Sequence, residues 1–345
     1  MPIPIKLSTV GKYLDQPALM EKINNVTPFV LATAGASYCV YDTFNAEKND
    51  QKKKLIQNAS VMTFTIASAL LATRGLKIKG KEIFKGLIEF PQVHKYDFEQ
   101  VLSKAYGERI IKIIDKIKDG KILNLKQVRE LEFHLNDTLN DPSLLKKIIP
   151  DAHNHGAFEE LKDLSLIGLI PVIGGIAGGI VGDLLTKTNP KDNFSDKIKE
   201  GSYQYLNNIF LCNVGAGLSM VLMNKLNVKS KAVRFSAMLA GVAGVGLAAG
   251  SLIANFVGKN LINPIFNKQK SVHSDFCSKF KDLNSERRPE ALDVSLHLDD
   301  VASVGFMSGF KWIGPILPVL YSVSGYRAGI GYRNGKTAEK RKSAV

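Results

Sequence analysis

The residue types that bind metal ions occur in this chain, but not at the spacing of a metal site. Asp151, His153, His155 and Glu159 form the densest group, and a His-x-His pair with nearby carboxylates can bind zinc. No further His or Cys follows at ligand spacing, so a solvated loop is the better interpretation. The three cysteines are far apart and form no C-x-x-C pair. We therefore expect no metal centre and no cofactor.

Two loops resemble ligand-binding motifs, and each departs from its motif at an essential position. Counted from Asp115, an EF-hand loop needs a bidentate carboxylate at its last position, where this chain has Lys126. An ordinary Asp-Gly turn is the simpler interpretation. The segment Gly331–Lys336 has one residue too few between its glycines for a phosphate loop, and no predicted strand precedes it. No G-x-S-x-G, H-E-x-x-H or paired-carboxylate pattern occurs, so we expect no enzymatic activity.

Glycines spaced four apart are the strongest motif of the chain. Residues at this spacing share one face of a helix, and a face without side chains lets a second helix approach closely in lipid. We expect these ridges to pack helices within one bundle, and the alternative is a homo-oligomeric or pore-forming interface. The first ridge is Gly174, Gly178 and Gly182 with Gly175 and Gly179 beside it, and the second is Gly246, Gly250, Ala254 and Gly258.

Lys311 is the single charge inside the last apolar stretch of the chain, between Phe310 and Trp312. A charge inside a membrane is costly unless it is paired or hydrated, so this lysine is a functional-site hypothesis. Alternatively, the helix begins near Trp312 and leaves the lysine at the interface, or the side chain snorkels. Pro315 and Pro318 favour a short or broken helix here.

Uncharged runs define the helices that would position these residues. A bilayer core needs about 20 predominantly apolar residues. Soluble helices normally carry a charged face, whereas Leu164–Gly182 has none and is rich in Gly, which weakens a water-exposed helix. We predict an all-α, polytopic membrane protein with about six spans, and a large soluble helical protein is the alternative. The runs are 23–41, 55–73, 164–182, 201–224 and 235–258, with 301–326 interrupted only by Lys311.

The intervening segments divide the chain into seven parts. They are an amphipathic N-terminal lead (1–22), a membrane hairpin of two spans (23–73), a helical soluble insert (74–163), a Gly-rich membrane bundle of three spans (164–258), a polar connection (259–300), a Pro-broken sixth span (301–326) and a basic tail (327–345). The insert has apolar residues at helical spacing and no run that predicts a strand. Polar residues open the first two runs, so this hairpin could instead lie in the membrane interface. The lead lacks the apolar region of a cleavable signal peptide.

The chain has 46 Lys and Arg against 32 Asp and Glu, a formal net charge of +14. In a soluble protein this excess would suggest nucleic acid. Here it is spread through loops, so we expect no nucleic-acid partner and predict contact with anionic headgroups of a lipid bilayer instead. In the tail we expect that contact from Arg327, Arg333, Lys336, Lys340, Arg341 and Lys342. The distribution of Lys and Arg favours an integral plasma (inner) membrane protein with both termini in the cytoplasm, although omitting the long insert reverses this balance.

Three functional hypotheses are compatible with these features. The first is a non-enzymatic multi-pass membrane protein with a structural, assembly or lipid-interacting role, its helices packed through small-residue ridges. The second is a transporter or channel-like protein that uses the Pro-broken last span and Lys311. The third is a peripheral helical protein with membrane-inserting hairpins.

Overall fold

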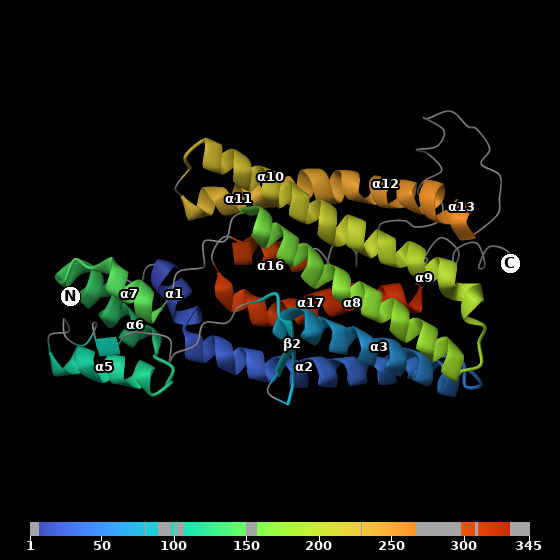
Figure 1. The fold of residues 1–345 in the computed structure, drawn as a ribbon, viewed down its shortest axis with the longest axis horizontal. Helices are drawn as coiled ribbons and strands as arrows, with labels where there is room; N and C mark the ends of the chain where they lie inside the picture. Colours follow the sequence, from blue (N-terminus) through green and yellow to red (C-terminus); the bar gives the residue numbers. More distant parts are fainter. Residues whose placement is uncertain are drawn as a thin grey trace. The chain divides into compact units, whose positions relative to one another are not determined.

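The structure is a computed structural model that describes residues 7–79, 81–88, 98–99, 102, 107–149, 157–228, 230–266, 298–307 and 310–331. Over these residues the chain is helical apart from one two-stranded sheet, which confirms the predicted all-α class (Figure 1). The chain forms two units. The first comprises Met1–Thr27, Ile88–His155 and Gly305–Ile316, and the second comprises Pro28–Leu87, Gly156–Val304 and Leu317–Val345.

The first unit is a small helical domain. Its helices are α1 (Leu7–Leu14), α5 (Glu108–Lys118), α6 (Leu125–Glu132), the π-helical η2 (Phe133–Thr138), α7 (Pro142–Ile148) and the 3₁₀ helix η6 (Lys311–Ile316). Asn124 begins α6 through a reciprocal capping box with Gln127. The side chain of Gln16 donates to the carbonyl oxygen of Leu123 at 3.1 Å and accepts from its N–H at 2.7 Å. The core is apolar, with Ile113, Ile114, Ile117, Leu123, Val128, Leu131, Leu135, Leu144, Leu145 and Ile148 all buried.

The second unit is a helical bundle in which α8 is the central helix (Figure 1). Helix α2 spans Pro17–Phe44 and contributes to this unit from Pro28 onward. The other elements are α3 (Gln51–Arg74), β1 (Gly75–Ile78), β2 (Lys81–Lys85), α8 (Ala157–Leu185), α9 (Pro190–Tyr205), η3 (Leu206–Phe210), α10 (Leu211–Lys225), α11 (Lys231–Gly241), η4 (Val242–Leu247), α12 (Ala248–Val257), η5 (Gly258–Ile262), α13 (Asn263–Phe266), α16 (Leu298–Met307, up to Val304) and α17 (Leu317–Ile330).

One glycine ridge of α8 lies against α3. A Cβ added at Gly178 would lie 2.8 Å from the Cβ of Phe64, and one at Gly182 would lie 3.0 Å from the Cα of Gln57. A Cβ at Gly174 would overlap a serine side chain of α3. The two helices therefore approach so closely that a larger side chain at these positions would push them apart.

The neighbouring ridge of α8 lies against α17, and here both helices contribute glycines. A Cβ added at Gly175 would overlap the carbonyl oxygen of Gly325, and one at Gly179 would overlap that of Gly329. Gly325 and Gly329 are themselves four residues apart, so two G-x-x-x-G faces meet. Neither of the predicted ridges includes Gly325 or Gly329.

The second predicted ridge lies on η4, α12 and η5. A Cβ at Gly250 would lie 2.6 Å from Oδ1 of Asn207, and one at Gly246 would overlap Sγ of Cys212 on α10. Ala254 is buried, whereas a Cβ at Gly258 would have no other atom within 4 Å. The first two glycines therefore line a helix contact and Gly258 has room for a side chain.

Among the described residues, three helices are long and apolar enough to cross a membrane, fewer than the six spans predicted. They are Gln51–Arg74, Leu161–Leu185 and Asn193–Lys225. The first predicted span lies in α2, which is continuous but is not one of these three. The fifth is divided around η4 into two shorter apolar helices, Val233–Gly246 and Leu252–Ile262. The sixth is divided by η6, a 3₁₀ helix over Lys311–Ile316 that contains Pro315.

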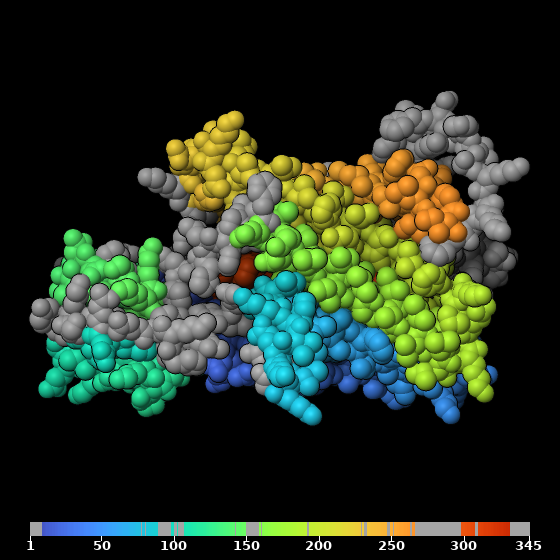
Figure 2. All heavy atoms as spheres, in the orientation of Figure 1, coloured from blue at the N-terminus to red at the C-terminus, as the bar shows by residue number. Residues whose placement is uncertain are grey.

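A short β-hairpin, which the sequence analysis did not predict, follows α3. Strands β1 and β2 pair antiparallel, with a register shift after Leu76. The hairpin protrudes from the face of the second unit that Figure 2 shows, where it is coloured cyan. Its first residue must be Gly75, since φ is +74° there and a Cβ would overlap the carbonyl oxygen of Phe84.

Candidate functional site

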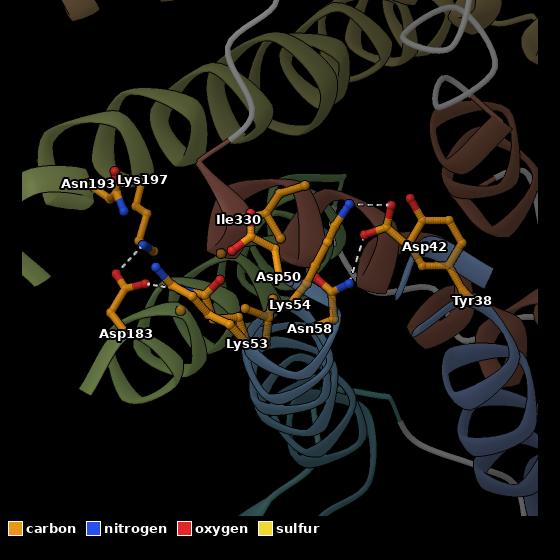
Figure 3. Close-up of a pocket in the computed structure, with 14 residues that line it drawn as sticks. Tyr38, Asp42, Asp50, Lys53, Lys54, Asn58, Asp183, Asn193, Lys197 and Ile330 are labelled. Atoms are coloured by element: carbon orange, nitrogen blue, oxygen red, sulfur yellow. Dashed lines mark hydrogen bonds and ion pairs between the residues drawn. The ribbon is translucent and has the colours of Figure 1, made fainter. Parts of the chain in front are cut away.

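Six charged side chains of the second unit line a pocket of about 550 Å³. The pocket lies where several helices begin or end: the last turns of α2, α8 and α17 and the first turns of α3 and α9 (Figure 3). Its lining residues are Tyr38, Asp42, Asp50, Lys53, Lys54, Gln57, Asn58, Val61, Gly179, Asp183, Asn193, Lys197, Gly329 and Ile330. We refer to it as the polar pocket.

Asp42 is the centre of one hydrogen-bonded group in the polar pocket. Lys54 donates to its Oδ1 at 3.1 Å, and the amide of Asn58 donates to its Oδ2 at 2.7 Å (Figure 3). The hydroxyl of Tyr326 in turn donates to the amide oxygen of Asn58 at 2.9 Å. These hydrogen bonds fix the orientation of Asp42 and Asn58. They also link side chains of α2, α3 and α17.

Asp183 is the centre of a second group, and this one is buried. Lys197 donates to Oδ2 of Asp183 at 2.6 Å, and only 4% of each side chain is exposed. The amide of Gln57 donates to Oδ1 of the same carboxylate at 3.0 Å. A buried carboxylate needs both an opposite charge and hydrogen bonds to offset its desolvation, and Asp183 has both.

The turn between α8 and α9 brings Asp183 and Lys197 together. Thr186 ends α8 by donating to the carbonyl oxygen of Gly182 at 2.8 Å. Lys187 has φ of +54°, which reverses the chain. Asn189 then caps α9, and Pro190 occupies the first helical position, where its missing N–H costs nothing.

A line of buried polar side chains continues from Lys197 along α9 and η3. The amide of Gln204 donates to Oε1 of Glu200 at 2.8 Å, that of Asn208 donates to Gln204 at 2.7 Å, and that of Asn207 donates to Asn208. Because a carboxylate only accepts, Glu200 fixes the orientation of all three amides. We refer to these four residues as the buried track.

Arg327 joins the buried track from α17. Its Nε lies 4.0 Å from Oε1 of Glu200, and at most 6% of either side chain is exposed. Sequence analysis placed Arg327 with the lipid-contacting basic tail, whereas it lies inside the bundle. The tail residues Arg333, Lys336, Lys340, Arg341 and Lys342 lie outside the described residues.

Two buried acidic residues, Asp299 and Asp300, lie on α16. Near them the hydroxyls of Ser303 and Tyr321 are 2.7 Å apart.

The remaining predicted residues lie outside the polar pocket and the buried track. Lys311 belongs to the first unit, where its Nζ lies 4.0 Å from the centre of the Phe306 ring. Glu159 is exposed on α8, and Asp151, His153 and His155 lie outside the described residues. In the part of the chain that is described, no three His, Cys, Asp or Glu side chains are grouped to hold a metal ion.

Sequence reasoning missed the polar pocket and the buried track, although two signals were present. Asp42 and Asp183 are the charges that end the first and third uncharged runs. Lys197, Glu200 and Gln204 recur at helical spacing, which places them on one face of a helix.

Comparison of the chain with known protein families, curated proteins and solved structures gives no match.

Proposed function

We propose that this chain is a non-enzymatic, multi-pass membrane protein that binds a lipid headgroup in the polar pocket. The observation that carries the proposal is the position of that pocket at the ends of apolar helices. The ends of membrane-crossing helices lie at headgroup depth, where charged side chains meet charged lipid groups. The side chain of Lys53, which lines the pocket, is a charged hydrogen-bond donor suited to a phosphate.

Apolar side chains on the outside of the bundle support its location in a membrane. On α2, Phe29 is 73% exposed and Phe44 is 75% exposed, with Val30, Val40 and Tyr41 also exposed. Similar side chains are exposed on α8 and α10, including Ile173 and Leu218. Such surfaces are uncommon on soluble monomers and are favourable against hydrocarbon.

We propose six membrane segments. Three are the long apolar helices, and the other three are irregular or less apolar than those. Helix α2 has 28 residues, long enough to cross a bilayer at 1.5 Å per residue. The segments around η4 and η6 have non-α turns, which membranes tolerate where protein surrounds the backbone. Six crossings leave both termini on one side, and we propose the cytoplasmic side of a plasma (inner) membrane.

Extraction of membranes with alkaline carbonate tests integration. We expect the full-length protein to stay in the membrane pellet, because its exposed apolar side chains are favourable against hydrocarbon. Single cysteines are introduced at exposed positions of the turn 45–50 and of helix α5. Their labelling with an impermeant maleimide shows on which side of the membrane each segment lies. Release into the soluble fraction would instead establish the peripheral interpretation.

A transporter is the second candidate, and the observation that favours it is the buried track. Glu200, Gln204 and Asn208 lie within Asn193–Lys225, one of the three long apolar helices, and polar residues there often mark solute paths. This version no longer uses Lys311. Proteoliposomes that hold imposed proton, potassium and chloride gradients as long as empty vesicles would count against it.

A further inference from the structure

A second pocket in the same unit has the opposite chemical character. It has a volume of about 490 Å³ and is lined by α2, α3 and α17. Six of its eleven lining residues have aliphatic or thioether side chains, and Arg327, which is paired with Glu200, lines it as well. The six are Leu31, Ala34, Met62, Val319, Val323 and Ile330. We refer to it as the apolar pocket. Known small-molecule sites span about 300–1,000 Å³, so it is large enough to hold a ligand or part of one.

The two pockets are neighbours that share lining residues. Tyr38 and Ile330 line both of them. The rings of Tyr38 and Tyr326 meet edge to face, with centres 5.2 Å apart and an interplanar angle of 87°. Tyr326 lines the apolar pocket while its hydroxyl donates to Asn58 of the polar pocket. Two aromatic rings with polar tips thus separate a charged space from an apolar one, an arrangement that suits the junction between a headgroup and a hydrocarbon chain.

The charges of the polar pocket indicate what kind of headgroup fits. Three carboxylates and three ammonium groups line it, so its formal charge is balanced. Asp42 with Lys54 and Asp183 with Lys197 form two internal ion pairs. Among the described residues, no hydrogen bond or ion pair links the side chains of Asp50 and Lys53 to other groups. One acid and one base are therefore available to a ligand, and a headgroup with one positive and one negative charge matches them.

The first turn of α3 favours the anionic part of such a headgroup near Lys53. This turn has no acidic residue, and Lys53 lies in it, at the end of the helix that already carries positive partial charge. The lysine at this end repels the helix dipole, and a phosphate beside Lys53 would relieve that repulsion. The cationic part of the headgroup would then lie near Asp50, the residue that precedes α3.

We propose that the two pockets together bind one molecule of a single-chain, zwitterionic amphiphile. Its phosphate-and-ammonium head occupies the polar pocket and its acyl chain occupies the apolar pocket. The inference rests on the proposed headgroup site and adds the charge of the head and the place of the chain. The balanced charges of the polar pocket select a zwitterionic head. The apolar pocket is smaller than the polar pocket and holds one acyl chain.

Binding of defined lipids to the purified full-length protein in detergent tests this inference. The probe is palmitoyl lysophosphatidylethanolamine, measured by native mass spectrometry against lysophosphatidylglycerol, dipalmitoyl phosphatidylethanolamine and palmitate. We expect the zwitterionic lysolipid to bind at least tenfold more tightly than the anionic lysolipid or palmitate. Equal or tighter binding of lysophosphatidylglycerol would overturn the zwitterionic class, and tighter binding of the two-chain lipid would overturn the single chain.

Two pairs of variants locate the head and the chain separately. Ala34→Trp fills the apolar pocket from an exposed position, and Ala36→Trp is its matched control because that alanine is exposed on the same helix but does not line the pocket. Lys53→Ala removes the available base, and Lys52→Ala removes an exposed lysine outside the pocket. We expect Ala34→Trp and Lys53→Ala each to weaken lysolipid binding about tenfold, and both controls to leave it unchanged.

The pattern of losses separates this inference from the proposed function. If Lys53→Ala weakens binding of every phospholipid and Ala34→Trp weakens none, the headgroup site stands and the chain site is wrong. If no phospholipid binds the wild-type protein, both are wrong. Size-exclusion profiles and thermal unfolding of each variant in detergent confirm that it is folded before binding is compared.

Discussion

Lys197→Ala should destabilise the protein by about 3–5 kcal/mol, because it leaves the Asp183 carboxylate buried without its cation. The remaining hydrogen bond from Gln57 cannot offset that loss. Unfolding of the purified protein in mixed detergent micelles, followed by circular dichroism, measures the change.

The double variant Asp183→Leu/Lys197→Leu is the control for this prediction. It removes both charges and retains bulky apolar side chains, so we expect it to recover most of the stability lost in the single variant. Lys187→Ala, an exposed lysine in the adjacent turn, should change stability by less than about 0.5 kcal/mol. A single variant as stable as wild type would show that the Asp183–Lys197 pair is not buried as described.

Gly175→Ala should also destabilise the protein, with a loss of about 3 kcal/mol. The added methyl group would overlap the carbonyl oxygen of Gly325, so α8 and α17 would have to separate along their whole contact. Because the polar pocket includes residues of both helices, lipid binding should fall with stability. The same unfolding assay measures the first effect, and native mass spectrometry measures the second.

Gly258→Ala is the matched control, since the same methyl group at that glycine would meet no other atom within 4 Å. We expect this variant to be neutral or slightly more stable, because Ala is the better helix residue. If Gly175→Ala and Gly258→Ala behaved alike, the close contact of α8 with α17 would be refuted.

The helical class of this protein could be predicted from sequence because its uncharged runs are long and regular. What the sequence did not reveal is where those runs break. The π-helical turn η4 depends on packing against α10. Pro315 restricts the backbone, but it does not specify that α17 begins at Leu317. The hairpin after Arg74 escaped prediction because its strands have four and five residues, too few to show an alternating pattern.

The candidate site was harder to predict because each of its residues looks unremarkable in its own segment. Asp42 and Asp183 mark the ends of uncharged runs, and a charge in that position is normal for any helix that leaves a membrane. Only the tertiary structure brings Asp42 to Asn58 and Asp183 to Gln57. Arg327 shows the opposite error, since its position beside the basic tail concealed its contact with Glu200.

The amount of native phospholipid that stays with the protein through detergent purification tests the central claim most directly. We expect about one phospholipid or lysophospholipid per chain for the wild type and for Lys52→Ala. We expect a marked loss for Lys53→Ala, whose side chain lines the polar pocket. Wild-type protein that is folded and free of phospholipid, or equal retention by Lys52→Ala and Lys53→Ala, would contradict a headgroup site in the polar pocket.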